Sequence, residues 1–98
     1  MQNETKKYDI LCVGELLIDM MSVDFAEDFS KVENFKRVQG GSPANLAMNM
    51  KRLGNRVCLV ASVGKDDMGD YLLQSVEEVG LERKSVARVE QPTTIILV

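Results

Sequence analysis

The sequence predicts an α/β fold, in which buried strands alternate with amphipathic helices. Residues 57–64 form a nearly continuous apolar run of strand length, which is typical of a strand covered on both faces. The segments on either side, residues 43–53 and the residues from about 67 onward, carry apolar side chains at helical spacing. Strand and helix patterns that alternate in this way indicate a βαβ unit.

Three extended segments are expected before the first helix. Residues 8–14 are a short apolar run closed by Gly14, so they predict a buried strand. Residues 18–23 and 35–39 predict two further extended segments. The charged stretch 25–34 between them predicts a surface loop.

The first helix is predicted over residues 43–53, with Ser42 as its N-cap and Gly54 as its stop. Pro43 suits the first turn, because its missing N–H costs no hydrogen bond there. The expected apolar face consists of Leu46, Ala47, Met50 and Leu53.

The second helix is predicted from about Asp67 to Gly80, capped by Asp66 or Asp67. Its expected apolar face consists of Leu72, Leu73, Val76 and Val79. After it, residues 85–89 and 93–98 are strand-like.

The composition is typical of a soluble globular protein, with 45% hydrophobic and 28% charged residues among 98. This length fits one small domain or part of a larger one. The net charge of -3 disfavours nucleic acid or an anionic membrane as the main partner. No apolar run approaches the roughly 18 residues of a membrane span, and the polar N-terminus does not resemble a signal peptide. We therefore expect a cytoplasmic protein.

Some chemistry is excluded by residue types alone. The chain has no histidine, which excludes a histidine general base, a Ser-His-Asp triad and histidine-ligated zinc. Cys12 and Cys58 lie in apolar stretches, so we expect buried free thiols rather than a disulfide or a metal site.

The candidate site centres on Gly40 and Gly41, two glycines that lead directly into a predicted helix. Glycine permits torsions and close approaches that a side chain blocks, and a helix N-terminus offers free N–H groups to a ligand. Asn45, one turn later, adds an amide that both donates and accepts hydrogen bonds. Taken alone, this stretch fits a structural turn as well as a ligand site.

Neither common nucleotide-binding motif occurs here. Gly14 lacks the further glycines of a dinucleotide fingerprint, and no phosphate-binding loop with its lysine is present. Because no Lys or Arg closely follows Gly40 and Gly41, a neutral polyhydroxyl ligand fits them at least as well as a phosphate.

Acidic residues give two further hypotheses. Asp19 lies among apolar residues, where a charge needs a partner or a ligand; it also fits a solvated strand end. Glu15 adjoins a glycine turn, which favours a surface position. Asp66, Asp67 and Asp70 allow a metal cluster, but acidic residues also gather at helix N-termini because the helix dipole favours them there.

The order of motifs closely resembles the N-terminal signature of the ribokinase-like (PfkB) carbohydrate kinase family. The resemblance rests on residues 13–19, 40–47, Leu53-Gly54, 63–70, Gly80-Leu81 and Pro92-Thr93-Thr94. It implies a mostly parallel central sheet with helices on both faces and a small β-sheet lid over the sugar. Residues 18–23, 35–39, 85–89 and 93–98 would supply lid strands or their bases, and in several members the lid forms a dimer interface.

Members of the family transfer the γ-phosphoryl group of ATP, with Mg²⁺, to a hydroxymethyl group of a sugar or nucleoside. The resemblance implies that Asp19 accepts hydrogen bonds from sugar hydroxyls, that Gly40 and Gly41 present backbone to the sugar, and that Asn45 binds another hydroxyl. The family's catalytic base and ATP pocket are expected beyond residue 98. No catalytic or metal-binding residue is therefore expected in this stretch, which alone should be inactive.

The leading hypothesis is the N-terminal part (residues 1–98) of one ribokinase-like kinase domain, from a sugar kinase of the fructokinase or keto-deoxygluconate kinase type. The alternative is a non-catalytic α/β module that binds a small polyol or mediates oligomerisation. Further sequence beyond Val98 would discriminate between the two.

Overall fold

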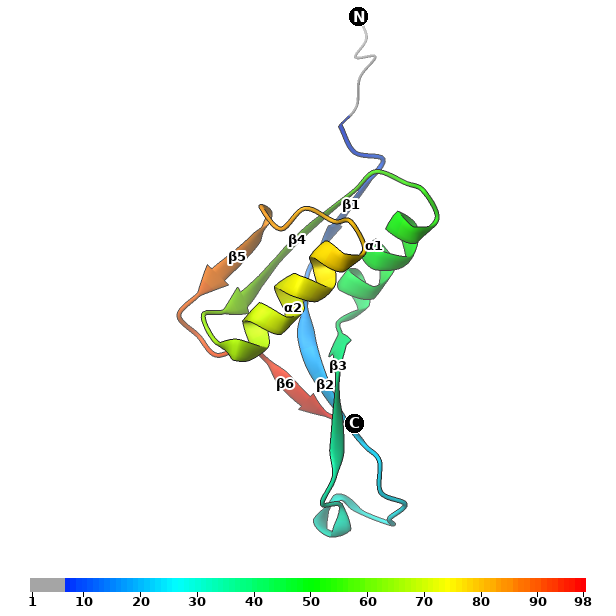
Figure 1. Ribbon diagram of the computed structural model, residues 1–98, viewed down its shortest axis with the longest axis vertical. Helices are drawn as coiled ribbons and strands as arrows, with labels where there is room; N and C mark the ends of the chain where they lie inside the picture. Colours follow the sequence, from blue (N-terminus) through cyan, green and yellow to red (C-terminus); the bar gives the residue numbers. More distant parts are fainter. Residues whose placement is uncertain (1–6) are drawn as a thin grey trace, which may run out of the picture.

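The computed structural model describes residues 7–98, and its helices and strands form two layers with a projecting hairpin (Figure 1). In chain order the elements are β1 (Ile10–Val13), β2 (Leu17–Ser22), the 3₁₀ turn η1 (Phe29–Lys31), β3 (Phe35–Gly40), α1 (Ser42–Arg52), β4 (Val57–Gly64), α2 (Asp67–Glu78), β5 (Val86–Val89) and β6 (Ile95–Leu97). Each predicted strand and helix is present, with ends within about two residues of the expected positions.

The strands form two separate sheets. In the first, β1, β4 and β5 are parallel and lie in the order β1-β4-β5, with Ile10 opposite Val57 and Ala61 opposite Val86. In the second, β2 lies between antiparallel β3 and parallel β6. We call the first sheet with α1 and α2 the body, and the second sheet with the loop between β2 and β3 the small sheet.

Both helices cover the same face of the body sheet (Figure 1). Helix α1 lies between β1 and β4 in the chain, and α2 lies between β4 and β5. Because the strand order advances in one direction, right-handed crossovers place both helices on one side. The buried core between them consists mainly of Cys12, Ala44, Ala47, Met48, Val57, Leu59, Val63, Leu72, Leu73, Val76, Leu81 and Val86.

The opposite face of the body sheet is open in the described residues. Leu11 and Val13 of β1 are 63% and 64% exposed, and Val60 of β4 also reaches the surface. Within residues 7–98 only one face of residues 57–64 is fully covered, whereas cover on both faces was expected. The implied arrangement of helices on both faces is likewise not found within residues 7–98, because both crossovers lie on one side.

Helix α1 departs from its prediction at its cap and on its buried face. Gly41 is the N-cap and makes no side-chain capping bond, so Ser42 is the first helical residue rather than the cap. The buried residues are Ala44, Ala47 and Met48, whereas Leu46 and Leu53 are 50% and 73% exposed. Two stripes of α1 have helical spacing, and the one with two alanines allows closer approach to the sheet.

Helix α2 confirms its predicted cap, since the Asp66 carboxylate accepts a bond of 2.7 Å from the N–H of Gly69. Its predicted face is also confirmed, with Leu72, Leu73 and Val76 buried. By contrast, β5 pairs with β4 in the body and supplies no strand of the small sheet, contrary to the role implied for residues 85–89.

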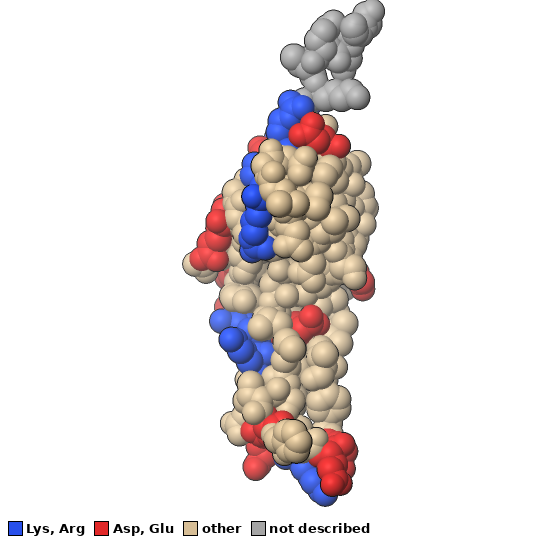
Figure 2. Space-filling view, turned by 90° about the vertical axis from the view of Figure 1, so that its right-hand side faces the viewer, with Lys and Arg blue, Asp and Glu red and all other residues tan. Residues whose placement is uncertain are grey.

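The small sheet projects away from the helices, and the hairpin of β2 and β3 ends in a polar tip (Figures 1 and 2). The Asp24 carboxylate holds the loop together by accepting bonds of 2.7 and 3.0 Å from the N–H groups of Glu33 and Asn34. These bonds lower the pKa of Asp24 below its usual value. The predicted surface loop 25–34 is confirmed and contains η1.

Candidate functional site

Asp19 lies in the middle strand of the small sheet, opposite Val38 of β3 and Ile96 of β6. It is half-buried, and its carboxyl group lies directly against Gly40 at the end of β3. A Cβ placed on Gly40 would be 2.6 Å from the carboxyl carbon of Asp19, which is closer than real Cβ atoms come. Only glycine at position 40 therefore leaves room for the carboxylate in this place.

Gly41 makes the sharp change of direction from β3 into α1. Its φ of 104° is strained for any residue with a side chain. A Cβ there would also lie 2.8 Å from the carbonyl carbon of Glu15, in the segment between β1 and β2. The glycine pair is thus required by both torsion and space.

Asn45 lies in the first turn of α1, and its N–H donates to the carbonyl oxygen of Gly41 at 2.8 Å. Its side-chain oxygen accepts a bond of 3.0 Å from the amide of Gln39, which also donates to the carbonyl of Gly40 at 2.9 Å. The fold thus gathers all four predicted residues, Asp19, Gly40, Gly41 and Asn45, around the junction of β3 and α1. Gln39 was missed from the sequence, where its only signal is its position just before the glycines.

A hollow of about 270 Å³ adjoins this junction. It lies where β1 ends and β6 begins, and its lining consists of Gly14, Glu15, Leu16, Leu17, Ser62 and Thr94. Ligands of open α/β sheets bind outside the carboxyl ends of the strands, which is the position of this hollow. Glu15 is exposed, as predicted. Ser62 and Thr94 carry no sequence signal, because each follows from the packing of segments distant in the chain.

The acidic residues near α2 make contacts with the protein rather than with one another. The Asp66 carboxylate caps α2, and Asp70 forms an ion pair of 2.9 Å with Arg88. Within residues 7–98, no group of three or more acidic or cysteine side chains is placed to hold a metal ion. Their contacts agree with the helix-dipole interpretation.

The two thiols are free, as predicted. Cys12 is buried and Cys58 is half-buried, beside the hydroxyl of Ser85. Burial raises the pKa of Cys12, which keeps it in the unreactive thiol form.

Comparison with known proteins identifies the family. Residues 7–98 match the profile of the pfkB family carbohydrate kinases. The chain belongs to this family. It is 45% identical over 95 residues to the ATP-dependent 6-phosphofructokinase of Thermoanaerobacterium thermosaccharolyticum, a match that covers 97% of this chain and 29% of the relative. The chain thus spans less than a third of that relative's length.

Solved structures of the pfkB family and its relatives have the same fold. An uncharacterized sugar kinase of Pyrococcus horikoshii in complex with ATP gives a TM-score of 0.87 at 36% identity, covering 91% of this chain and 30% of that chain. The fructokinase of Halothermothrix orenii gives a TM-score of 0.87 at 35% identity, covering 92% and 33%. The predicted α/β, ribokinase-like architecture is therefore confirmed. Among the described residues, no helix is long and apolar enough to span a membrane.

Proposed function

We propose that residues 1–98 are the N-terminal part of a single sugar kinase domain, and that they supply part of the sugar site. The protein to which they belong, called the intact protein below, would transfer the γ-phosphoryl group of ATP to a hydroxymethyl group of a small sugar. The position of Asp19 against Gly40, at the start of α1, is the observation that carries this proposal.

The chemistry of the junction suits sugar hydroxyls. A carboxylate accepts hydrogen bonds from hydroxyl groups, and bonds to a charged acceptor are stronger than neutral ones. Asn45 adds an amide, and the N-cap Gly41 contributes backbone without a competing capping side chain. The residues named here bind and orient a hydroxyl-bearing ligand; none of them is assigned a proton-transfer role.

ATP and Mg²⁺ are the proposed co-substrate and metal of the intact protein, and the ATP-bound relative supports this part of the proposal. The described residues do not fit these groups, since they contain neither a metal-ligand cluster nor a phosphate-binding lysine loop. Phosphoryl transfer depends on positioning and charge neutralisation at the transferring group. We place those functions outside residues 1–98.

Two relatives are named for phosphorylation of a ketose, a fructokinase and a 6-phosphofructokinase, and several others are named 5-dehydro-2-deoxygluconokinase. We propose fructose or fructose 6-phosphate as the substrate, with a keto-deoxygluconate as the alternative. An assay of the intact protein with ATP and each of the three would decide. Phosphorylation of none of them would contradict the proposed substrate class.

The site residues are tested by paired substitutions in the intact protein. Asp19→Asn removes the charge, and we expect the KM for sugar to rise about 10- to 100-fold while the KM for ATP stays the same. Asn45→Ala should raise the sugar KM by about 3- to 10-fold. Asn49→Ala is the matched control, because Asn49 is exposed one turn further along α1. An unchanged sugar KM in both site variants would refute the assignment.

The small sheet is also the proposed surface for a homodimer. Its strands expose apolar side chains, among them Met21, Ile95 and Leu97. Light scattering of the intact protein and of a Met21→Glu variant would test this, and an unchanged mass would contradict it. We place the reaction in the cytoplasm, where ATP is available.

A further inference from the structure

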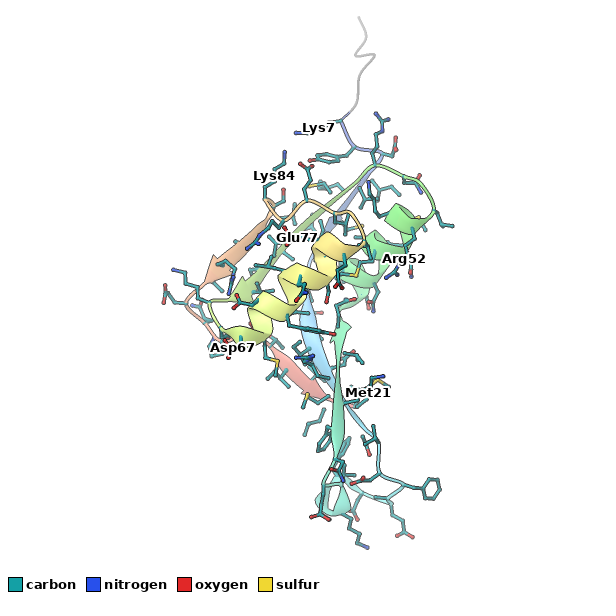
Figure 3. All side chains as sticks on the ribbon, viewed as in Figure 1. Lys7, Met21, Arg52, Asp67, Glu77 and Lys84 are labelled. Carbon is teal, nitrogen blue, oxygen red and sulfur yellow. The ribbon has the colours of Figure 1, made fainter. Side chains whose placement is uncertain are left out.

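The chain passes between the body and the small sheet at three places. The first two, residues 14–16 and the pair Gly40 and Gly41, contain glycines with positive φ at Gly14 and Gly41. The third, residues 90–94, contains no glycine and is held by side chains from the body. This third connection lies beside the start of α2, which Asp67 marks in Figure 3.

Asp66 binds the third connection through both of its carboxylate oxygens. One oxygen accepts the N–H of Thr93 at 2.9 Å. The other accepts the Thr93 hydroxyl at 2.6 Å and the N–H of Gly69 at 2.7 Å. A side chain that only capped α2 would need the last of these bonds alone, so two of the three serve the connection.

Thr93 and Arg88 also form hydrogen bonds with Gly64 at the end of β4. Thr93 is buried, and its hydroxyl also accepts the N–H of Gly64 at 2.9 Å. Arg88 donates to the carbonyl of Gly64 at 3.0 Å and pairs with Asp70. These bonds tie Thr93 to the end of β4 and to the start of α2, and they fix it to the body.

Backbone hydrogen bonds connect the segment that follows Thr93 to β2, the strand that carries Asp19. The carbonyl of Thr94 accepts the N–H of Ile18 at 2.9 Å, and β6 then runs parallel to β2 with Ile96 opposite Asp19. Shifting Thr93 would therefore shift β6, and with it the strand that carries the carboxylate.

We propose that Asp66 and Thr93 are positioning residues that set the place of Asp19 relative to the body. The inference rests on the proposed role of Asp19 in sugar binding. Asp66 and Thr93 do not contact the sugar; they act through β6.

The test compares Thr93→Val with Thr93→Ser in the intact protein. Valine keeps the volume of threonine but loses the hydroxyl bonds to Asp66 and Gly64, while the backbone N–H of residue 93 still donates to Asp66. Serine keeps the hydroxyl. We expect Thr93→Val to raise the sugar KM by about three- to tenfold with an unchanged ATP KM. Thr93→Ser should keep the sugar KM of the unsubstituted protein. Ser75→Ala is the matched control, since its hydroxyl bonds to the Tyr71 carbonyl within α2 and has no link to β6.

A second variant separates positioning from helix capping. Asp66→Asn keeps a good N-cap, because asparagine caps helices about as well as aspartate, but its NH₂ group cannot accept the Thr93 N–H. We expect it to raise the sugar KM as Thr93→Val does. The proposal would be overturned if Thr93→Val and Asp66→Asn lost stability equally and left the sugar KM unchanged. It would also be overturned if Thr93→Ser raised the sugar KM as much as Thr93→Val does.

Hydrogen exchange distinguishes failure of this inference from failure of the proposed function. If the intact protein phosphorylates no sugar, Thr93→Val should still speed amide exchange in β2, in β6 and at Gly64, which loses its bond to the hydroxyl, and leave β1 and residues 57–63 of β4 unchanged. Unchanged exchange in β2 and β6 would overturn the positioning role whatever the substrate.

Discussion

The body and the small sheet are stabilised in different ways. In the body, two helices bury side chains such as Leu59, Leu72 and Val76 against a parallel sheet. In the small sheet, only the base of β2 is fully covered, at Ile18, and β6 is exposed along its length. The body is therefore held mainly by apolar burial, and the small sheet by backbone hydrogen bonds and its connections to the body.

Because of this difference, the stability of the protein and the position of its site depend on different regions. Asp19 belongs to the small sheet, whereas Asn45 belongs to a helix of the body. Substitutions in the body core should change the free energy of unfolding of the whole protein. Substitutions in the small sheet or at the connections should alter sugar binding with a smaller effect on unfolding.

The largest effect is expected in the body core. Leu72 is fully buried, so Leu72→Ala should lower the free energy of unfolding of the intact protein by about 2–5 kcal/mol. Lys36 is exposed on β3 of the small sheet, and Lys36→Ala should cost less than about 1 kcal/mol. Urea unfolding measures both. Equal losses would mean that the body and the small sheet share one core.

A smaller effect is expected where the two regions meet. Gly41→Ala would combine a positive φ with a contact against the backbone of Glu15, so we expect a loss of about 2–4 kcal/mol. Gly54→Ala is the matched control, because Gly54 has a similar φ of 96° and open space around it. We expect about 1 kcal/mol there. Similar losses in the two variants would show that torsion alone requires Gly41.

Local sequence patterns predicted the elements well because each pattern is produced by local physics. The alternation of apolar runs with helical spacing locates both helices. It also narrows the cap of α2 to Asp66 or Asp67, because a cap depends on neighbouring residues, and the structure assigns it to Asp66. Asp19 and Asn45 are candidates from their surroundings alone, and the resemblance to the pfkB family adds their expected roles in binding sugar hydroxyls. The structure gathers those residues at one junction.

What sequence patterns missed depends on contacts between distant segments. The choice between two helical stripes of α1 is decided by how closely the helix approaches the sheet, and the alanine stripe is the buried one. The second role of Asp66 depends on Thr93, which is 27 residues away along the chain. The placement of β5 in the body depends on strand order, which residues 85–89 do not encode locally.

The smallest effect is expected from pH, and it tests the connection against the hairpin tip. The Thr93 hydroxyl, followed by the N–H groups of Thr93 and Gly69, lowers the pKa of Asp66. An unfolded aspartate titrates near about 3.9. The stability that Asp66 contributes is therefore complete above that pH, and it is lost as the pH falls through the lower pKa of the folded state.

Asp66→Asn should thus lower the unfolding free energy at pH 7 and reduce its further loss between about pH 4 and pH 2, as measured by urea unfolding across that range. Asp24→Asn is the comparison, because hydrogen bonds also lower the pKa of Asp24, but at the tip of the small sheet. Both variants should make the free energy of unfolding depend less on pH in the acid range. Only Asp66→Asn should raise the sugar KM at pH 7. If Asp24→Asn raised it equally, the small sheet would move as one rigid unit from tip to base, and the connection at Thr93 would have no special part in placing Asp19.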